Sequence, residues 1–254
     1  MRLFSSLLAA LCLAGLAACQ PNPPARACNE VTFEDQAFTV CHVAANDPGI
    51  ALFHTHADGA PYGEFDRLAE TVTEAGGTLL FAMNGGMYHE DRRPVGLYVE
   101  NGEEAAGLVT RAGPGNFGML PNGVFWVDEA GGAHVTETLA YDALGITPRF
   151  ATQSGPMLVI DGALHPDFNA DGPSRKRRNG VGLSADGTVL YFAISDVPVN
   201  FHTFARLFRD ELGAGNALYL DGVVSRLYAA ELDRDEKGLT LGPIVAVTRT
   251  PAAN

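Results

Sequence analysis

The sequence predicts a single α+β domain with a mixed or antiparallel β-sheet core and a few helices packed on it. Short runs rich in β-branched and aromatic residues recur along the chain, and two segments have the apolar spacing of a helix. No repeat, low-complexity tract or linker divides the chain, and the roughly 225 residues beyond its N-terminal segment suffice for one domain. Polar and glycine residues follow several predicted strands, so we expect a functional site at the strand ends.

Residues 1–19 have the features of an export signal. Arg2 provides a short positive region, and the apolar run from Leu3 to Leu16 is too short to remain as a transmembrane helix. The segment ends in Leu-Ala-Ala-Cys, which resembles a bacterial lipobox and predicts lipidation of Cys19; an ordinary cleaved signal peptide is the alternative. Residue 20 is not Asp, so we expect a periplasmic protein anchored to the outer membrane of a Gram-negative bacterium. Residues 20–27, with three prolines, form a short extended tether before the domain of residues 28–254.

The expected mature chain is acidic and retains two cysteines for pairing. Loss of Arg2 leaves 16 basic residues against 30 acidic ones, a net charge of about −14, which argues against non-specific binding of nucleic acid. Cys12 leaves with the signal and Cys19 carries the lipid. We therefore expect a disulfide between Cys28 and Cys41 in the oxidising periplasm. Two thiolates alone are too few ligands for a structural zinc site.

The first part of the domain predicts three short strands and one helix. The β-type runs lie at residues 31–33, 37–43 and 49–56. His54 and His56 share a face if the third run is a strand, but an exposed polar face explains them as well as a metal does, because no third ligand is indicated nearby. Apolar residues at helical spacing then predict a helix over residues 64–75, which Gly76-Gly77 ends.

Polar residues interrupt or end the next predicted strands. These strands lie at residues 78–83, 94–102, 123–128 and 133–136, with a loop over residues 113–122. The first of them leads directly into Asn84-Gly85-Gly86. A further apolar run over residues 150–162 is interrupted by Gln153-Ser154-Gly155-Pro156. Because unpaired polar groups are costly to bury, these side chains either pair inside the core or line a pocket.

A run of four cations stands out in this acidic chain at residues 175–178. A solvated loop accounts for most such runs. The alternative is an anion site in which at least one guanidinium points inward, since its planar fork suits phosphate. A hairpin around residues 185–187 follows and delivers Ser195 and Asp196 at its end.

The last predicted helix and strands frame an acidic residue. Apolar periodicity predicts a helix over residues 200–212 with Gly213 as its C-cap, and a closing strand over residues 240–247. Between them an apolar run stops at Asp221-Gly222, with a hydroxyl at Ser225. Asp-Gly often only reverses the chain. A carboxylate at the end of a core strand is also held rigidly and can face a cleft.

Taken together, these strand ends predict one site built from several short loops on a rigid sheet. Gly155 and Gly222 would allow a ligand to approach the backbone closely. The sequence contains no G-x-S-x-G elbow, P-loop or H-E-x-x-H motif. The candidate site residues are Asn84, Gly85, Gly86, Gln153, Ser154, Gly155, Arg178, Asn179, Ser195, Asp196, Asp221, Gly222 and Ser225.

Several sequence blocks together resemble the bacterial phosphodiester glycosidase domain family, over roughly residues 30–250. The resemblance implies hydrolysis of a sugar–phosphate diester, and so a phosphorylated glycan or sugar phosphodiester as the partner. Within it, Asn84, Gly85, Gly86, Gln153, Gly155, Arg178 and Asp221 match the family's motif positions. The blocks are residues 84–88, 94–102, 151–158, 174–182, 199–210 and 216–222.

The expected chemistry assigns a role to each polar group. Arg178 holds the phosphodiester anion, with the neighbouring cations steering from outside, and the amides of Asn84 and Gln153 contact sugar hydroxyls or the phosphate. Asp221 assists at the anomeric carbon through an oxocarbenium-like state, with Asp196 as the second carboxylate. No cofactor or metal ion is expected.

Two other functions use the same residues. A non-catalytic envelope module would bind a phosphorylated glycan or a protein partner in the same pocket and would tolerate loss of Asp221. A metal-dependent phosphodiesterase would combine Asp221, Asp196 and a histidine, but the histidines have no ligand spacing. The sequence leaves the sugar, its aglycone and the oligomeric state open.

Overall fold

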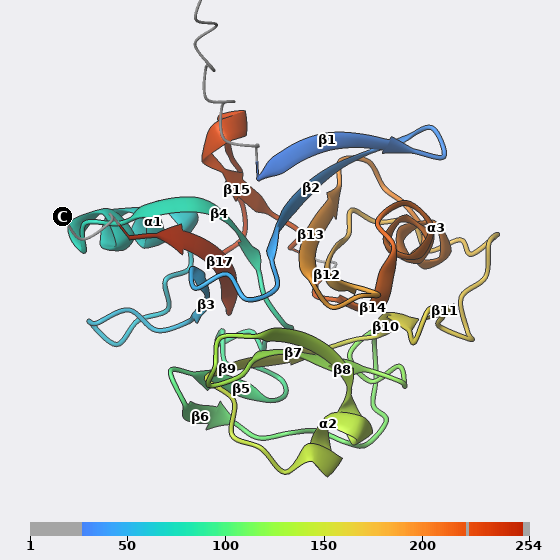
Figure 1. Ribbon diagram of the computed structural model, residues 1–254, viewed down its shortest axis with the longest axis horizontal. Helices are drawn as coiled ribbons and strands as arrows, with labels where there is room; N and C mark the ends of the chain where they lie inside the picture. Colours follow the sequence, from blue (N-terminus) through green and yellow to red (C-terminus); the bar gives the residue numbers. More distant parts are fainter. Residues whose placement is uncertain (1–26, 222–223, 251–254) are drawn as a thin grey trace, which may run out of the picture.

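Three antiparallel β-sheets surround a common apolar core in the computed structural model, which describes residues 27–221 and 224–250 (Figure 1). The first sheet has the strand order β1 (Cys28–Phe33), β2 (Gln36–Ala44), β13 (Val189–Ser195), β12 (Asn179–Ser184), β14 (Ala214–Tyr219), β10 (Met157–Ile160) and β11 (Ala163–Leu164). The second has the order β16 (Arg234–Asp235), β15 (Leu227–Ala229), β4 (Thr78–Asn84), β17 (Ile244–Arg249) and β3 (Ile50–Phe53). The third has the order β6 (Glu103–Ala106), β5 (Tyr98–Glu100), β9 (Phe150–Ser154), β7 (Gly123–Val127) and β8 (Ala133–Glu137).

Each sheet buries one face in the central core and the other against a helix. Strand β7 shows the alternation, because Phe125 and Val127 lie in the central core whereas Val124 and Trp126 pack with Tyr141 of α2 (Thr138–Leu144). All five residues of β7 are buried, and such a continuous apolar run is typical of a strand covered on both faces. In the same way α1 (Phe65–Glu74) covers the second sheet, and α3 (Phe201–Arg206) covers the first. The predicted α+β class is confirmed.

The two predicted helices are present. Helix α1 buries Phe65, Leu68 and Val72, as its spacing indicates. The Asn200 side chain caps α3 by accepting a hydrogen bond from the Thr203 N–H at 2.8 Å. The chain then continues as a π-helical turn, η1 (Leu207–Glu211), before Gly213 leaves it at a φ of 65°.

Helix α2 was not predicted from the sequence, because it is a short helix between two strands. Its seven residues begin after Glu137, whose carboxylate accepts hydrogen bonds from two N–H groups of the first turn. It ends at Gly145, which has the left-handed φ of 58° that glycine favours. A short 3₁₀ turn, η2 (Ala230–Leu232), lies between β15 and β16.

Three strand predictions need correction. The strand predicted over residues 94–102 is shorter, because β5 comprises Tyr98–Glu100 and a turn follows it. The closing strand β17 begins at Ile244 rather than residue 240, because Pro243 has no N–H to donate to a strand ladder. Strand β3 ends at Phe53, so His54 and His56 do not share a strand face. The predicted hairpins around residues 129–132 and 185–187 are confirmed.

The predicted disulfide is confirmed. Cys28 and Cys41 are opposite each other in the β1–β2 ladder, and their sulfur atoms are bonded. The export signal, Cys19 and residues 20–26 of the tether lie outside the described residues. None of the helices within residues 27–221 and 224–250 is long and apolar enough to cross a membrane.

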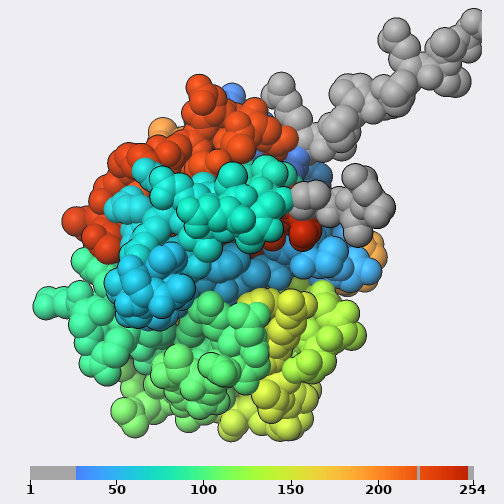
Figure 2. Space-filling view, turned by 90° about the vertical axis from the view of Figure 1, so that its left-hand side faces the viewer, coloured from blue at the N-terminus to red at the C-terminus, as the bar shows by residue number. Residues whose placement is uncertain are grey.

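The interruption predicted at residues 153–156 marks a change of sheet. Strand β9 ends at Ser154 in the third sheet, and β10 starts at Met157 in the first. Figure 2 shows the side on which α1 lies, with the C-terminal strands in orange and red above it and residues of the third sheet in green and yellow below. At the places where the chain passes from one sheet to another, polar groups from different sheets can meet. The candidate site lies at these junctions.

Candidate active site

Three strand ends meet around Asn179, the first residue of β12. Its side-chain oxygen accepts hydrogen bonds from Nδ2 of Asn84 and from the backbone N–H of Asp221, both at 3.2 Å. Its Nδ2 donates to the Asn84 carbonyl at 3.0 Å. Both asparagines are fully buried, so their amides act as internal connectors between the second sheet, which ends at Asn84, and the first.

Ser225 holds the other side of Asp221. Its hydroxyl lies 2.8 Å from the Asp221 carbonyl, 3.2 Å from the Arg177 carbonyl and 3.3 Å from Oδ1 of Asn179. The backbone of Asp221 is therefore bound on its N–H side by Asn179 and on its carbonyl side by Ser225. Gly222, predicted to approach the ligand, lies outside the described residues.

The carboxylate of Asp221 lies within electrostatic reach of two phenols. Burial and the charge of Asp221 raise the pKa of Tyr88 to about 12. The same two causes raise the pKa of Tyr219, against the opposing effect of Arg178. Asp221 itself is 8% exposed. A nearly buried carboxylate beside protonated phenols is an arrangement suited to acid–base or electrostatic chemistry.

Arg178 is the most deeply buried cation of the predicted anion site. Its guanidinium donates to the Val199 carbonyl at 2.9 Å and to the Ser174 carbonyl at 2.8 Å, and it lies 3.6 Å from the centre of the Phe201 ring. It also reaches the Tyr219 hydroxyl at 3.3 Å. These contacts orient Tyr219, and any contact between Arg178 and a phosphate would require some of them to be released.

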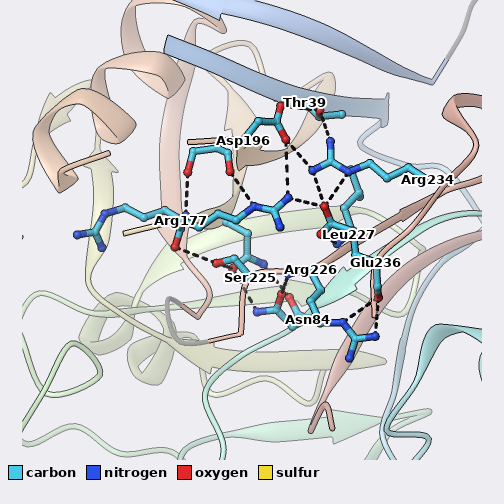
Figure 3. A network of polar contacts seen from close by, with 12 residues as sticks. Thr39, Asn84, Arg177, Asp196, Ser225, Arg226, Leu227, Arg234 and Glu236 are labelled. Atoms are coloured by element: carbon cyan, nitrogen blue, oxygen red, sulfur yellow. Dashed lines mark hydrogen bonds and ion pairs between the residues drawn. The ribbon is translucent and has the colours of Figure 1, made fainter. Parts of the chain in front are cut away.

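Asp196 belongs to a neighbouring network of charges, shown in Figure 3. Its carboxylate accepts from Arg234 at 2.6 Å and from the Thr39 hydroxyl at 3.0 Å. Glu236 links Arg234 to Arg177, with N–O distances of 2.8 and 2.5 Å. Because Ser225 contacts the Arg177 carbonyl, this network supports the loop that carries Asp221. Asp196 thus lies next to the site rather than among the groups that touch Asn179.

Arg226 connects the same network to the second sheet. Its backbone N–H donates to Oδ1 of Asn84 at 3.0 Å, and its guanidinium donates to the carbonyls of Glu236 and Leu239 and to the Glu64 carboxylate. At 4% exposure it is a structural cation. No local pattern marks Arg226, Arg234 or Glu236 as a group, because their partners come from distant segments. Tyr88, in contrast, could have been identified from the sequence, because it belongs to the Asn-Gly-Gly-Met-Tyr block at residues 84–88.

Gln153 lies away from this cluster. The alternation along β9 places its side chain on the face toward α2, where its amide contacts the N–H groups of Leu97 and Val109 and the Thr138 hydroxyl. Ser154 points to the opposite face and donates to the Leu220 carbonyl, one residue before Asp221. The structure therefore brings Ser154, and not Gln153, to the strand end that carries Asp221.

The candidate glycines allow backbone segments to approach each other. A Cβ on Gly86 would lie 2.4 Å from the Gln153 carbonyl oxygen, and one on Gly155 would lie 2.6 Å from Cβ of Asn122. Gly85 donates its N–H to the Pro243 carbonyl at 2.7 Å. Ser195 accepts from the Arg178 N–H at 2.9 Å, so it fixes the start of β12. Among the described residues, no three His, Cys, Asp or Glu side chains form a group that could hold a metal ion.

Solved structures with the same fold include an animal glycosidase. The catalytic domain of zebrafish N-acetylglucosamine-1-phosphodiester α-N-acetylglucosaminidase, described as auto-inhibited by its pro-peptide, aligns with a TM-score of 0.61 at 15% identity, over 87% of this chain and 81% of that one. A protein from Synechocystis aligns with a TM-score of 0.51 at 14% identity, over 87% and 61% of the two chains. At these identities the likeness establishes the fold.

The sequence comparisons identify the family. The family model for phosphodiester glycosidases matches residues 77–244, a range that includes Asn84, Asn179 and Asp221. The Escherichia coli K12 protein YigE, which is uncharacterized, is 34% identical over 206 residues, covering 80% of this chain and 77% of YigE. The match to this family model defines the domain as a hydrolase of the glycosidase kind. The chain belongs to the phosphodiester glycosidase family.

Proposed function

We propose that this protein hydrolyses a glycosyl-1-phosphodiester in the bacterial envelope, with Asp221 acting at the anomeric carbon. The observation that carries the proposal is the fixation of Asp221. Its backbone is bound by Asn179 on one side and Ser225 on the other, at the junction of two sheets. Rigid placement of a carboxylate is what a reaction through an oxocarbenium-like state requires.

The reaction needs little acid assistance. Water adds its oxygen to the anomeric carbon while the bond from that carbon to the phosphate oxygen breaks, giving the free sugar, a phosphomonoester and a proton. A phosphate is already a good leaving group, so one carboxylate can suffice. Asp221 supports the developing positive charge on the sugar, either electrostatically or as a nucleophile. The Tyr219 hydroxyl accepts a hydrogen bond from Arg178 and keeps its own proton, so it is available as a hydrogen-bond donor near the site, whereas the Tyr88 hydroxyl already donates to the Thr240 carbonyl.

A second carboxylate role for Asp196 stays a proposal. Its two oxygens are bound by Arg234 and Thr39, so direct participation would require these contacts to open. Substitution of Asp196 by Asn distinguishes the two roles. If Asp196 is catalytic, the substitution should lower kcat and leave the free energy of unfolding unchanged. If Asp196 is purely structural, the substitution should lower the free energy of unfolding as well.

The test of the activity is turnover of a defined phosphodiester panel. N-acetylglucosamine is the first sugar to examine, since the zebrafish enzyme of the same fold is named for its 1-phosphodiester. We expect Asp221→Asn to reduce hydrolysis by about 10²-fold or more, while the thermal unfolding midpoint stays close to that of the wild type. Asp142→Asn, on the exposed surface of α2, is the matched control and should leave turnover unchanged.

Two results would contradict the proposal. Near-normal turnover by Asp221→Asn would remove this residue from the mechanism. Binding of the panel without any turnover by the wild-type chain would instead favour an envelope module that binds a phosphorylated glycan.

The proposed location also has a direct test. Lipidation of Cys19 would place the domain at the periplasmic face of the outer membrane, at the end of a short proline-containing tether. Metabolic labelling with a fatty acid should mark the full chain and not the Cys19→Ser variant. An unlabelled wild-type chain found free in the periplasm would support an ordinary signal peptide.

A further inference from the structure

We propose that Arg92, stacked near the ring of Tyr88, is the residue that binds the phosphate group of the substrate. This inference rests on the proposed function and specifies where the anionic half of a glycosyl phosphodiester is held. Arg92 lies four residues after Tyr88, in the turn that follows the Asn84-Gly85-Gly86 strand end. It was not among the site residues expected from the sequence.

The arginines around Asn179 and Asp221 already form hydrogen bonds or ion pairs within the protein. Arg178 binds the carbonyls of Val199 and Ser174. Arg177 and Arg234 bind Glu236. Arg226 donates to three main-chain or carboxylate acceptors and is nearly inaccessible, as its 4% exposure shows. A phosphate could reach the buried guanidinium groups of Arg178 and Arg226 only by rearranging their contacts, and the charges of Arg177 and Arg234 are already paired with Glu236.

Arg92 is different. Across the described ranges 27–221 and 224–250, its guanidinium has no hydrogen bond or ion pair, and it lies over the Tyr88 ring, 5.4 Å from the guanidinium carbon to the ring centre. The side chain is partly exposed. Its N–H donors are therefore available to a ligand, and the planar fork of a guanidinium suits two phosphate oxygens.

The backbone of Arg92 is held in an uncommon conformation. Its φ is 72°, in the left-handed region that residues other than glycine seldom adopt. The Arg92 N–H donates to the His89 carbonyl at 2.8 Å, and the Arg92 carbonyl lies 2.8 Å from Nε2 of His54. Tyr88 and Pro94 form a bridge across the base of the turn. These contacts fix the backbone of the turn from which the Arg92 side chain extends.

Tyr88 connects this turn to Asp221. Asn84, four residues before Tyr88, donates to the Asn179 oxygen that also accepts from the Asp221 N–H, so the Tyr88 turn and Asp221 adjoin the same buried amide. In agreement with this, the charges of Arg92 and Asp221 both act on the Tyr88 phenol, with opposite signs. Tyr88 is fixed by a hydrogen bond from its hydroxyl to the Thr240 carbonyl at 3.2 Å. A glycosyl phosphodiester has its phosphorus one oxygen away from the anomeric carbon. A cation and a carboxylate beside one phenol therefore match the two ends of the bond that breaks.

The His54 side of the Arg92 turn does not suit an anion. A cavity of about 460 Å³ lies there, lined by His54, Tyr98 and the carboxylates of Glu100, Glu103 and Glu104. His54, which contacts the Arg92 carbonyl, is shared between this cavity and the turn. Three carboxylates would repel a phosphate, so the anion is expected on the Tyr88 and Asp221 side of Arg92.

The experiment compares four variants with inorganic phosphate and a glycosyl methyl phosphodiester as probes. Arg92→Asn removes the charge and keeps a residue that tolerates positive φ. Arg92→Lys keeps the charge without the fork. Arg93→Gln is the matched control, because Arg93 is adjacent and exposed, and pairs with Asp91 instead. A double variant, Arg175→Gln with Lys176→Gln, tests two exposed cations of the 175–178 run, for which the sequence suggested a steering role. Thermal unfolding confirms that each variant is folded.

We expect Arg92→Asn to weaken phosphate binding, measured by calorimetry, and to raise KM, each by about 10-fold or more, with a smaller effect on kcat. Arg92→Lys should be intermediate. Arg93→Gln and the double variant should stay within about 2-fold of the wild type. Unchanged phosphate affinity and KM in Arg92→Asn would overturn the proposal, and so would a larger loss in the double variant.

Failure of the proposed function gives a separate result. If the wild-type chain hydrolyses no member of the panel, the function is wrong, but phosphate binding still decides the role of Arg92. Binding to the wild type that is lost in Arg92→Asn would support the anion site. Absence of measurable phosphate binding to the wild-type chain would refute it.

Discussion

Asn84 and Asn179 exchange two hydrogen bonds at the junction of the first and second sheets, side chain to side chain at 3.2 Å and side chain to carbonyl at 3.0 Å. The oxygen of Asn179 that accepts from Asn84 also accepts from the N–H of Asp221. One buried amide thus joins two sheets and positions the proposed catalytic residue. The stability of the domain and the placement of Asp221 are consequently coupled at this residue.

Replacing Asn179 by Ala should therefore affect both properties. The change leaves Nδ2 of Asn84 and the Asp221 N–H without their buried acceptor, and we expect a loss of about 2–4 kcal/mol in the free energy of unfolding. Urea denaturation measures this loss, and turnover should fall in the same variant. Asn46→Ala, at an exposed position, is the control and should change the unfolding midpoint little. A stability equal to that of the wild type would show that the Asn84–Asn179 connection is not structurally important.

Glu236 should make the domain sensitive to acid. Burial of the carboxyl acts to raise its pKa, but hydrogen bonds from Arg177 and the Leu227 N–H and the charge of Arg234 outweigh burial and lower it. A carboxyl with a lowered folded-state pKa stabilises the fold above its ordinary pKa, and this stabilisation is lost as the pH falls through the folded-state value. We expect the unfolding free energy to decline below about pH 4.5 as the carboxyl takes up a proton.

The Glu236→Gln variant tests this. It should cost about 1.5–3 kcal/mol at neutral pH, because Arg177 and Arg234 lose a charged partner. Below pH 4 the difference from the wild type should shrink. Glu103→Gln, at an exposed position of β6, is the control. A difference that is constant from pH 3 to pH 7 would exclude Glu236 as the titrating group.

Among the candidate residues, the structure brings together those that the sequence places where predicted strands meet polar segments. Asn84, Asn179, Asp221 and Ser225 are in contact with one another, and each was selected by alternation and chain breaks, which are local signals. Arg178 was also found locally, but its contacts with Val199 and Ser174 depend on how distant segments fold. The sequence therefore cannot distinguish an arginine whose guanidinium is bound by backbone carbonyls from one whose guanidinium is available to a ligand.

Helix α2 and the charged network around Glu236 show what local patterns miss. Helix α2 is too short for its periodicity to exceed that of a loop, and it is stabilised by Tyr141 packing against Trp126. Glu236 follows a two-residue strand and gains its partners from segments near residues 177 and 227. Helix α2 and the Glu236 network both depend on how the three sheets pack together, and no local pattern in the sequence predicts that packing.

Tyr88 should ionise at unusually high pH. Burial and Asp221 raise its pKa to about 12, so its hydroxyl stays a donor throughout the physiological range. A raised folded-state pKa stabilises the fold fully below the ordinary tyrosine pKa of about 10, and this stabilisation is lost as the pH rises through the folded-state value. Burial also raises the pKa of Tyr98, Tyr141 and Tyr219, so absorbance titration at alkaline pH should show several late ionisations, one of which is absent from Tyr88→Phe. Loss of an ionisation at about pH 10 instead of a late one in the variant would contradict the assignment.

The Cys28–Cys41 bond should stabilise the domain without affecting the site. It closes a short loop, with a sequence separation of 13, and joins β1, an edge strand of the first sheet, to β2. Restricting a loop of this size in the unfolded chain is worth about 3 kcal/mol. The Cys28→Ala, Cys41→Ala double variant should therefore unfold at lower urea concentration and keep the kcat of the wild type. Because the contacts that hold Asp221 come from Asn179 and Ser225, a large fall in kcat below the unfolding transition would mean that β1 influences the site directly.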